Sequence, residues 1–102
     1  IENKALDIKF KEQKEFILSK QLLRSGTAIG ALVREAKFAQ SKADFINKMS
    51  IALKEANETK YWLSLLYDNE YIDNPSFQSI FEEAKEVTAI LVSIVKTTKE
   101  NH

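Results

Sequence analysis

Only two glycines and one proline occur among the 102 residues, and this scarcity constrains the fold more than any other feature of the sequence. Tight turns between strands rely on glycine and proline, so a fold with many strands is disfavoured. The single proline, Pro75, directly follows Asn74, and this pair is typical of a helix start. A chain of this length is expected to form one domain over residues 1–102. The sequence therefore predicts an all-α domain.

Apolar residues recur at helical spacing in four segments, which we expect to form helices at residues 2–12, 16–39, 42–68 and 75–99. A polar junction at residues 11–15 separates the first two, so the first helix is expected to be short. Ser41, followed three residues later by Asp44, is typical of a capping box at the start of the third. The predicted architecture is an antiparallel up-and-down four-helix bundle.

Both glycines, Gly26 and Gly30, lie four residues apart on the flank of the second predicted helix. Each one costs about 1 kcal/mol relative to alanine in a helix interior, so we expect another backbone to approach closely there and to offset that cost. Packing within the bundle and packing between subunits would both satisfy this expectation. The GxxxG spacing is best documented for helices in membranes, so the spacing alone does not choose between them.

Three of the predicted helices carry more apolar residues than one core stripe requires. In a single bundle of 102 residues no helix is surrounded on all sides, so the additional apolar stripes predict a homo-oligomer. The residues expected at the subunit interface are Leu23, Gly26, Gly30, Phe38, Ile51, Trp62, Leu65, Ile90 and Ile94.

Basic and acidic side chains balance at fifteen each, but basic residues outnumber acidic ones in the first forty positions. Clustered lysines and arginines are the electrostatic signature of a surface that binds nucleic acid. A solvated face with surface ion pairs would give the same pattern. The candidate RNA-binding residues are Lys20, Arg24, Arg34, Lys37, Lys42 and Lys48.

The sequence offers little for catalysis or for metal binding. It has no cysteine and one histidine, His102, at its C-terminal end. We therefore expect no catalytic residue, no metal, no cofactor and no small-molecule substrate. Glu55 lies at the margin of a core stripe, and a partly buried carboxylate needs a cation, so we expect a structural ion pair with Arg24 or Arg34.

No apolar run in the sequence approaches the length that spans a bilayer, and no signal-peptide pattern opens the chain. The absence of cysteine fits a reducing compartment. We therefore expect a cytoplasmic protein with no membrane partner.

Two stretches, "LSKQLLRSGTAIGALVREA" and "SKADFINKMSIALKEANETKYWLSLL", resemble the bacterial four-helix-bundle family known as the 23S rRNA intervening-sequence proteins. The resemblance runs from about Phe16 to Leu66 and implies a four-helix bundle assembled as a homopentamer. Some members of that family are encoded inside insertions in 23S rRNA genes. A related branch serves as an accessory protein of retroelements and binds a reverse transcriptase and RNA. The resemblance implies no catalytic residue.

On this resemblance, Arg24, Arg34 and the lysines of the second helix are candidate RNA contacts. The first helix is shorter than in the family, which leaves part of one bundle face uncovered. The function expected from the sequence is that of a non-enzymatic homopentameric module that binds RNA or a ribonucleoprotein. The alternative is a protein–protein adaptor or assembly scaffold that makes no contact with nucleic acid.

Overall fold

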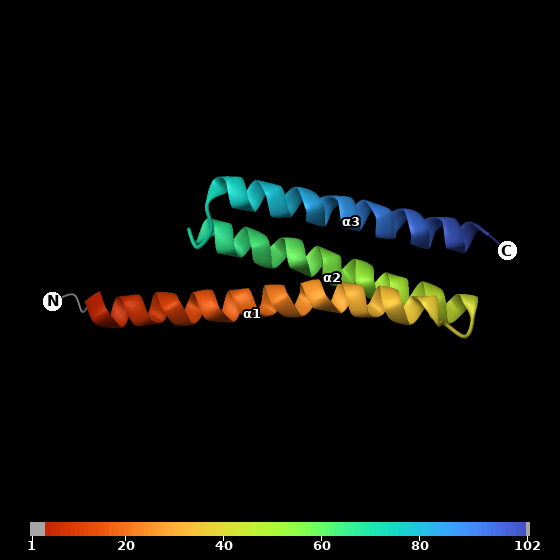
Figure 1. The fold of residues 1–102 in the computed structure, drawn as a ribbon, viewed down its shortest axis with the longest axis horizontal. Coiled ribbons are helices and arrows are strands. Elements are labelled where there is room, and N and C mark those ends of the chain that lie inside the picture. The colour runs from red at the N-terminus through yellow and green to blue at the C-terminus, as the bar shows by residue number, and fades with distance from the viewer. Residues whose placement is uncertain (1–3, 102) are drawn as a thin grey trace.

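A computed structural model describes residues 4–101, which form three helices connected by short turns: α1 (Lys4–Lys37), α2 (Lys42–Asp68) and α3 (Asn74–Glu100) (Figure 1). The molecule is elongated, with principal extents of 67 × 24 × 16 Å. Successive helices run in opposite directions, and α2 lies between the other two. Within the described residues, no Cα atom of α1 comes within 8 Å of a Cα atom of α3.

The prediction of a four-helix bundle is wrong, because the described chain contains three helices. The two helices expected at 2–12 and 16–39 are one continuous helix, α1, which passes through the predicted junction at residues 11–15. That junction reads KEQKE. Lysine, glutamate and glutamine are good helix formers, and neither glycine nor proline interrupts them, so the backbone has no local reason to turn. The predicted start at residue 2 lies outside the described residues.

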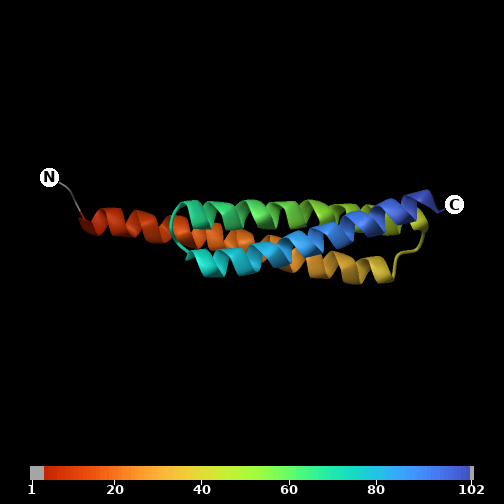
Figure 2. The ribbon, with the colours of Figure 1, turned by 90° about the horizontal axis from the view of Figure 1, so that it is seen from above.

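α1 extends beyond the end of α2 and α3, as both views show (Figures 1 and 2). The turn between α2 and α3 contacts α1 at two points. The Lys14 Nζ atom donates to Asn69 Oδ1 at 2.7 Å, and the Tyr71 hydroxyl donates to the backbone carbonyl of Lys11 at 3.0 Å. Residues 4–10 therefore form an arm that projects past the three-helix region.

The start of α2 has the capping geometry that its sequence predicts. The Ser41 side chain accepts a hydrogen bond from the backbone N–H of Asp44 at 3.0 Å. The Asp44 carboxylate accepts from the backbone N–H of Gln40 at 3.3 Å, one residue before the position that a full capping box would use.

The end of α2 is a Schellman motif without glycine. The Tyr71 N–H donates to the Leu66 carbonyl, and the Glu70 N–H donates to the Tyr67 carbonyl. Glu70 occupies the left-handed position, with φ of 63°, where glycine is usual. The hydrogen bonds of the motif therefore hold a residue type that has no intrinsic preference for this conformation.

α3 begins one residue earlier than its sequence pattern indicates. The N-cap is Asp73, not Asn74, and its carboxylate accepts from the backbone N–H of Ser76 at 2.7 Å. Asn74 lies in the first turn and donates instead to the Tyr67 hydroxyl at 2.7 Å. The sequence pattern placed the helix start within one residue, because two adjacent residues, Asp73 and Asn74, are both able to cap.

The hydrogen bond from the Ser76 backbone lowers the pKa of Asp73, with a smaller contribution from the Ser76 side chain. A carboxyl whose pKa is lower in the folded state stabilises the fold above its unfolded-state pKa, and this contribution is lost as the pH falls through the folded-state value. We expect thermal unfolding between neutral pH and about pH 3 to show a smaller acid dependence in Asp73→Asn, because asparagine still caps the helix but does not titrate. An unchanged pH profile would contradict this assignment.

The core lies along α2, where it faces α1 and α3. Its small residues Ala52 and Ala56 are fully or almost fully buried and allow the neighbouring helices to come close. A polar pair crosses the α1–α2 contact: Thr59 Oγ1 lies 3.0 Å from Ser25 Oγ, and Ser25 donates to the Leu22 carbonyl at 3.1 Å. The buried apolar residues are Leu18, Ala36, Met49, Ala52, Ala56, Leu63, Leu66, Leu91 and Val95.

Candidate nucleic-acid interface

Basic residues gather at the end of the molecule where α1 finishes and α2 begins. Arg34 and Lys37 lie in the last turn of α1, and Lys42 is the first residue of α2. The C-terminal end of α3 reaches the same end of the molecule (Figures 1 and 2), and its last turn carries Lys99. The four-residue turn between α1 and α2 thus brings together cations from elements that are separate in the sequence. We call this region the basic end.

An exposed aromatic ring lies in the middle of the basic end. Phe38, directly after α1, is 78% exposed. It lines an open hollow of about 630 Å³ together with Arg34, Glu35 and Lys48. Bases of single-stranded nucleic acid stack on such aromatic rings, while neighbouring cations contact the phosphates. Phe38 and Arg34 thus place an exposed ring and a cation at the same hollow.

The two carboxylates that line the hollow with Phe38 are already engaged within the chain. Glu35 lies 3.6 Å from the Lys48 Nζ atom, and Asp44 accepts the hydrogen bond from Gln40 described above. By contrast, no ion pair within residues 4–101 involves Arg34, Lys37 or Lys42. These three cations therefore keep their charge available for a ligand.

The six predicted RNA-binding residues do not form one surface. Arg34, Lys37 and Lys42 lie together at the basic end, and Lys48 lines its hollow while it is paired with Glu35. Lys20 is exposed four helical turns away from Arg34 along α1.

Arg24 serves the fold rather than a ligand. Its Nη2 atom lies 2.9 Å from Glu58 Oε2, and its Nη1 atom lies 3.4 Å from Glu55 Oε2. Two arginines were expected as partners for Glu55. The structure pairs Glu55 with Arg24, whereas Arg34 lies in the last turn of α1. Glu55 is largely buried, with a side chain that is 12% exposed. The pair fixes the register of α1 against α2.

The predicted interface residues fall on more than one side of the molecule. Leu23, Gly26 and Gly30 are exposed on α1, and Ile90 is exposed on α3. Ile94 is half-buried and packs against the core. Ile51, Trp62 and Leu65 lie on α2, so no single flat contact can include all nine residues.

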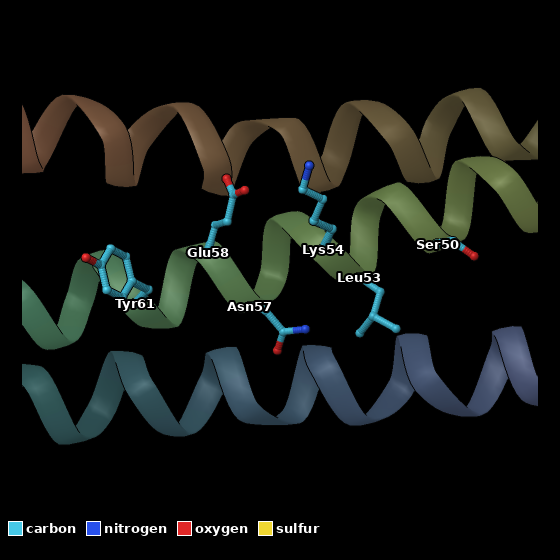
Figure 3. Close-up of a pocket in the computed structure, with 6 residues that line it drawn as sticks. All are labelled: Ser50, Leu53, Lys54, Asn57, Glu58 and Tyr61. Carbon is cyan, nitrogen blue, oxygen red and sulfur yellow. The ribbon is translucent and has the colours of Figure 1, made fainter.

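The outer surface of α2 carries a separate hollow of about 470 Å³, lined by side chains of this helix alone (Figure 3). In that view Glu58 and Lys54 point towards α1, whereas Leu53 and Asn57 point towards α3. Glu58 is held by Arg24. Tyr61 and Lys54 also line this hollow, so it offers one aromatic ring and one cation without an ion pair among residues 4–101.

Within residues 4–101 no cluster of three or more histidine, cysteine, aspartate or glutamate side chains has the arrangement that a metal ion needs. His102 lies outside these residues. In the same part of the chain, no helix combines the length and the apolar character required to cross a membrane.

Sequence reasoning missed the contribution of α3 to the basic end. Lys96 and Lys99 lie near the C-terminus of that helix. A helix that runs parallel to α1 ends where α1 ends, so a predicted up-and-down order already implies this position. The order of the helices was the signal that could have located Lys99. The local sequence around Lys99 does not distinguish it from any other solvated lysine.

The chain is similar to known proteins over most of its length. The family model described as 23S rRNA-intervening sequence protein matches residues 3–93. A crystal structure from Bacteroides thetaiotaomicron, of a protein with unknown function from the S23 ribosomal protein family, is 61% identical in sequence, with a TM-score of 0.79. The match covers 83% of this chain and 79% of that chain. No curated protein matches. The chain belongs to the 23S rRNA-intervening sequence protein family.

Proposed function

We propose that this chain is a non-catalytic, homo-oligomeric module that binds single-stranded RNA, free or within a ribonucleoprotein, through the basic end. The observation that carries the proposal is the exposed Phe38 ring, which lines the hollow with Arg34 and directly follows Lys37 in the chain; neither cation has an ion pair within residues 4–101. Glu35 and Asp44, the two carboxylates that line the hollow, are engaged by Lys48 and by the Gln40 backbone.

The role of each side chain in the site follows from its residue type. Arg34 offers a planar fork of donors that fits a phosphate, whereas Lys37 and Lys42 act as mobile point charges. Phe38 supplies a stacking platform that accepts any base. A site of this kind recognises the backbone and the exposed bases of a single strand with little sequence preference, and its affinity falls as the salt concentration rises.

Repetition of the site in an assembly would strengthen binding. A few phosphate contacts give a weak site, but several copies held at fixed spacing act on one RNA strand at a high effective concentration. The exposed apolar residues Leu23 and Ile90 favour an assembly. The resemblance to the family implies five subunits, and the mass of the protein in solution tests that number.

We expect the double variant Arg34→Glu/Lys37→Glu to bind single-stranded RNA at least tenfold more weakly than the wild-type protein, because two phosphate contacts are replaced by repulsion. The matched control is Lys9→Glu/Lys11→Glu, which makes the same change in net charge at the opposite end of α1. Fluorescence anisotropy with a labelled oligonucleotide measures both.

If the two double variants lose affinity equally, RNA binds through net charge alone and the assignment to the basic end is wrong. If the wild-type protein binds no RNA, the function as an RNA-binding module is wrong. An adaptor or assembly scaffold without nucleic-acid contact would then be the remaining function for the assembly.

A further inference from the structure

A second exposed aromatic ring lies on α2, in the hollow of Figure 3. Tyr61 is 56% exposed and lines this hollow together with Lys54. The Tyr61 ring packs edge-on against Trp62, with ring centroids 5.0 Å apart and an interplanar angle of 65°. Lys54 has no ion pair among residues 4–101. Tyr61 and Lys54 therefore repeat, on a second helix, the combination of ring and cation that Phe38 and Arg34 make at the basic end.

The two hollows open on the same side of the molecule. Arg24 and Glu35 leave α1 within roughly 20° of each other around the helix axis. Arg24 forms an ion pair with Glu58, which lines the hollow of α2. Glu35 forms an ion pair with Lys48, and these two residues line the hollow beside Phe38. We call the surface of α1 and α2 that lies between the two exposed rings the α1–α2 face.

The glycines of α1 lie on the opposite side of the molecule. Gly26 is about 160° away from Arg24 around the helix axis and lines a separate hollow with Ala56 and Thr59. A Cβ atom added at Gly26 or at Gly30 would meet no atom within 4 Å beyond its immediate helix surroundings. Packing inside the described chain therefore does not explain these glycines. A backbone that approached them from outside would leave the α1–α2 face uncovered.

The two helix segments that form the α1–α2 face carry an excess of positive charge. Residues 16–38 and 45–67 together contain seven lysines and arginines and three carboxylates, although the two signs balance over the whole sequence. All three carboxylates are paired, Glu35 with Lys48, and both Glu55 and Glu58 with Arg24. This local excess favours a polyanion as the ligand. The cations of these segments without an ion pair among residues 4–101 are Lys20, Arg34, Lys37, Lys54 and Lys60.

We propose that a single RNA strand held at the basic end continues along the α1–α2 face and stacks a further base on Tyr61. The rise along α2 from Lys48 to Tyr61 is about 20 Å, so the strand spans several nucleotides. Lys54 lies midway along this path and contacts a phosphate. Ser50 and Asn57 line the same hollow and offer hydrogen-bonding groups to base edges and ribose hydroxyls. This path deepens the proposed function and rests on it.

The fluorescence of Trp62 measures whether the strand reaches Tyr61. Trp62 is the only tryptophan in the chain, and its ring packs against the Tyr61 ring. Saturation of the wild-type protein with an unstructured RNA oligonucleotide of about 8 nucleotides should change its emission. An oligonucleotide of about 4 nucleotides, which the basic end alone can hold, should leave the emission unchanged. Unchanged emission with the longer oligonucleotide, while anisotropy shows that it is bound, would overturn the path.

Substitution of Tyr61 gives a second, independent measurement. Tyr61→Ala should weaken binding of the longer oligonucleotide about tenfold, within the usual range for the loss of one stacking ring. Tyr61→Phe keeps the ring and should bind like the wild-type protein. The matched control is Phe16→Ala, because Phe16 is 64% exposed near the arm and lines a different hollow. Equal losses of affinity in Tyr61→Ala and Phe16→Ala would overturn the path.

The outcomes separate this inference from the proposed function. If Arg34→Glu/Lys37→Glu loses RNA binding but Tyr61→Ala does not, the basic end binds RNA and the path along α2 is overturned. A wild-type protein that binds neither oligonucleotide overturns both. A Tyr61→Ala variant with altered mass in light scattering and unchanged affinity assigns Tyr61 to a subunit contact and overturns the path. Weaker binding of the longer oligonucleotide alone, at unchanged mass, supports the path.

Discussion

Leu63→Ala is expected to destabilise the protein by about 3 kcal/mol, the largest effect that we predict for a single substitution. Leu63 is 0% exposed and is one of the two largest fully buried side chains among the described residues. It lies on α2, the helix that both other helices contact, so a cavity at this position weakens the packing of that helix. A domain of about 100 residues has only about 5–15 kcal/mol of stability in total, and the midpoint of thermal unfolding should fall by more than about 10 °C.

The control for this substitution is Ile17→Ala, which removes the same number of carbon atoms from a side chain that is 58% exposed. We expect it to change the free energy of unfolding by no more than about 0.5 kcal/mol. Urea denaturation of both variants measures the difference. Equal effects would mean that Leu63 is not part of a packed core, and the arrangement of the three helices would then be wrong.

Arg24→Met is expected to cost about 1–2 kcal/mol, the second large effect. The Arg24 side chain is 50% exposed, which reduces the value of its ion pairs, but Glu55 is largely buried and depends on it. Without the arginine, the Glu55 carboxylate stays in the α1–α2 contact with no compensating charge. The loss of stability therefore comes chiefly from the Glu55 carboxylate that is left without a cation.

A double-mutant cycle tests this origin. Glu55→Gln, added to Arg24→Met, should recover part of the lost stability, because a neutral amide is less costly to leave there. Glu58→Gln should recover less, because that side chain is 35% exposed. Arg34→Met makes the same chemical change at a position without an ion pair and should be nearly neutral. An Arg24→Met variant as stable as the wild-type protein would contradict the structural role of the pair.

The sequence predicted where most helical residues lie, because helical spacing of apolar residues is a strong local signal. Leu18 and Ala36 on one helix, and Ala52 and Leu63 on the next, recur at helical spacing, and all four are buried. The extent of the first helix was not predictable in this way. A polar segment such as KEQKE is compatible with a junction between helices and with a solvated helical turn. Only its contacts in the folded protein determine which of the two forms.

The buried polar pair shows a second limit of the sequence pattern. Ser25 is 0% exposed, although serine is usually exposed, because Thr59 and the Leu22 carbonyl satisfy its hydroxyl. Its partner lies 34 positions away in the sequence. No periodicity within one helix identifies such a pair, because the register between α1 and α2 brings it together.

For the candidate site, the sequence supplied the residue types, and the fold supplied their grouping. The sequence pattern does not distinguish Arg24 from Arg34, because either arginine was expected to pair with Glu55. The α1–α2 register pairs Arg24 with Glu55 and leaves Arg34 beside Phe38. A list of basic residues therefore mixes cations that hold the fold with cations that are free to bind.

The measurement that tests the account most directly is a titration of the wild-type protein with labelled single-stranded RNA at about 50 mM and about 200 mM salt. Three phosphate contacts by Arg34, Lys37 and Lys42 predict a slope of about −2 in log K against log salt, so the affinity should fall by roughly an order of magnitude. Binding that does not change with salt, or no binding at either concentration, would contradict the proposal that the basic end is an RNA-binding site.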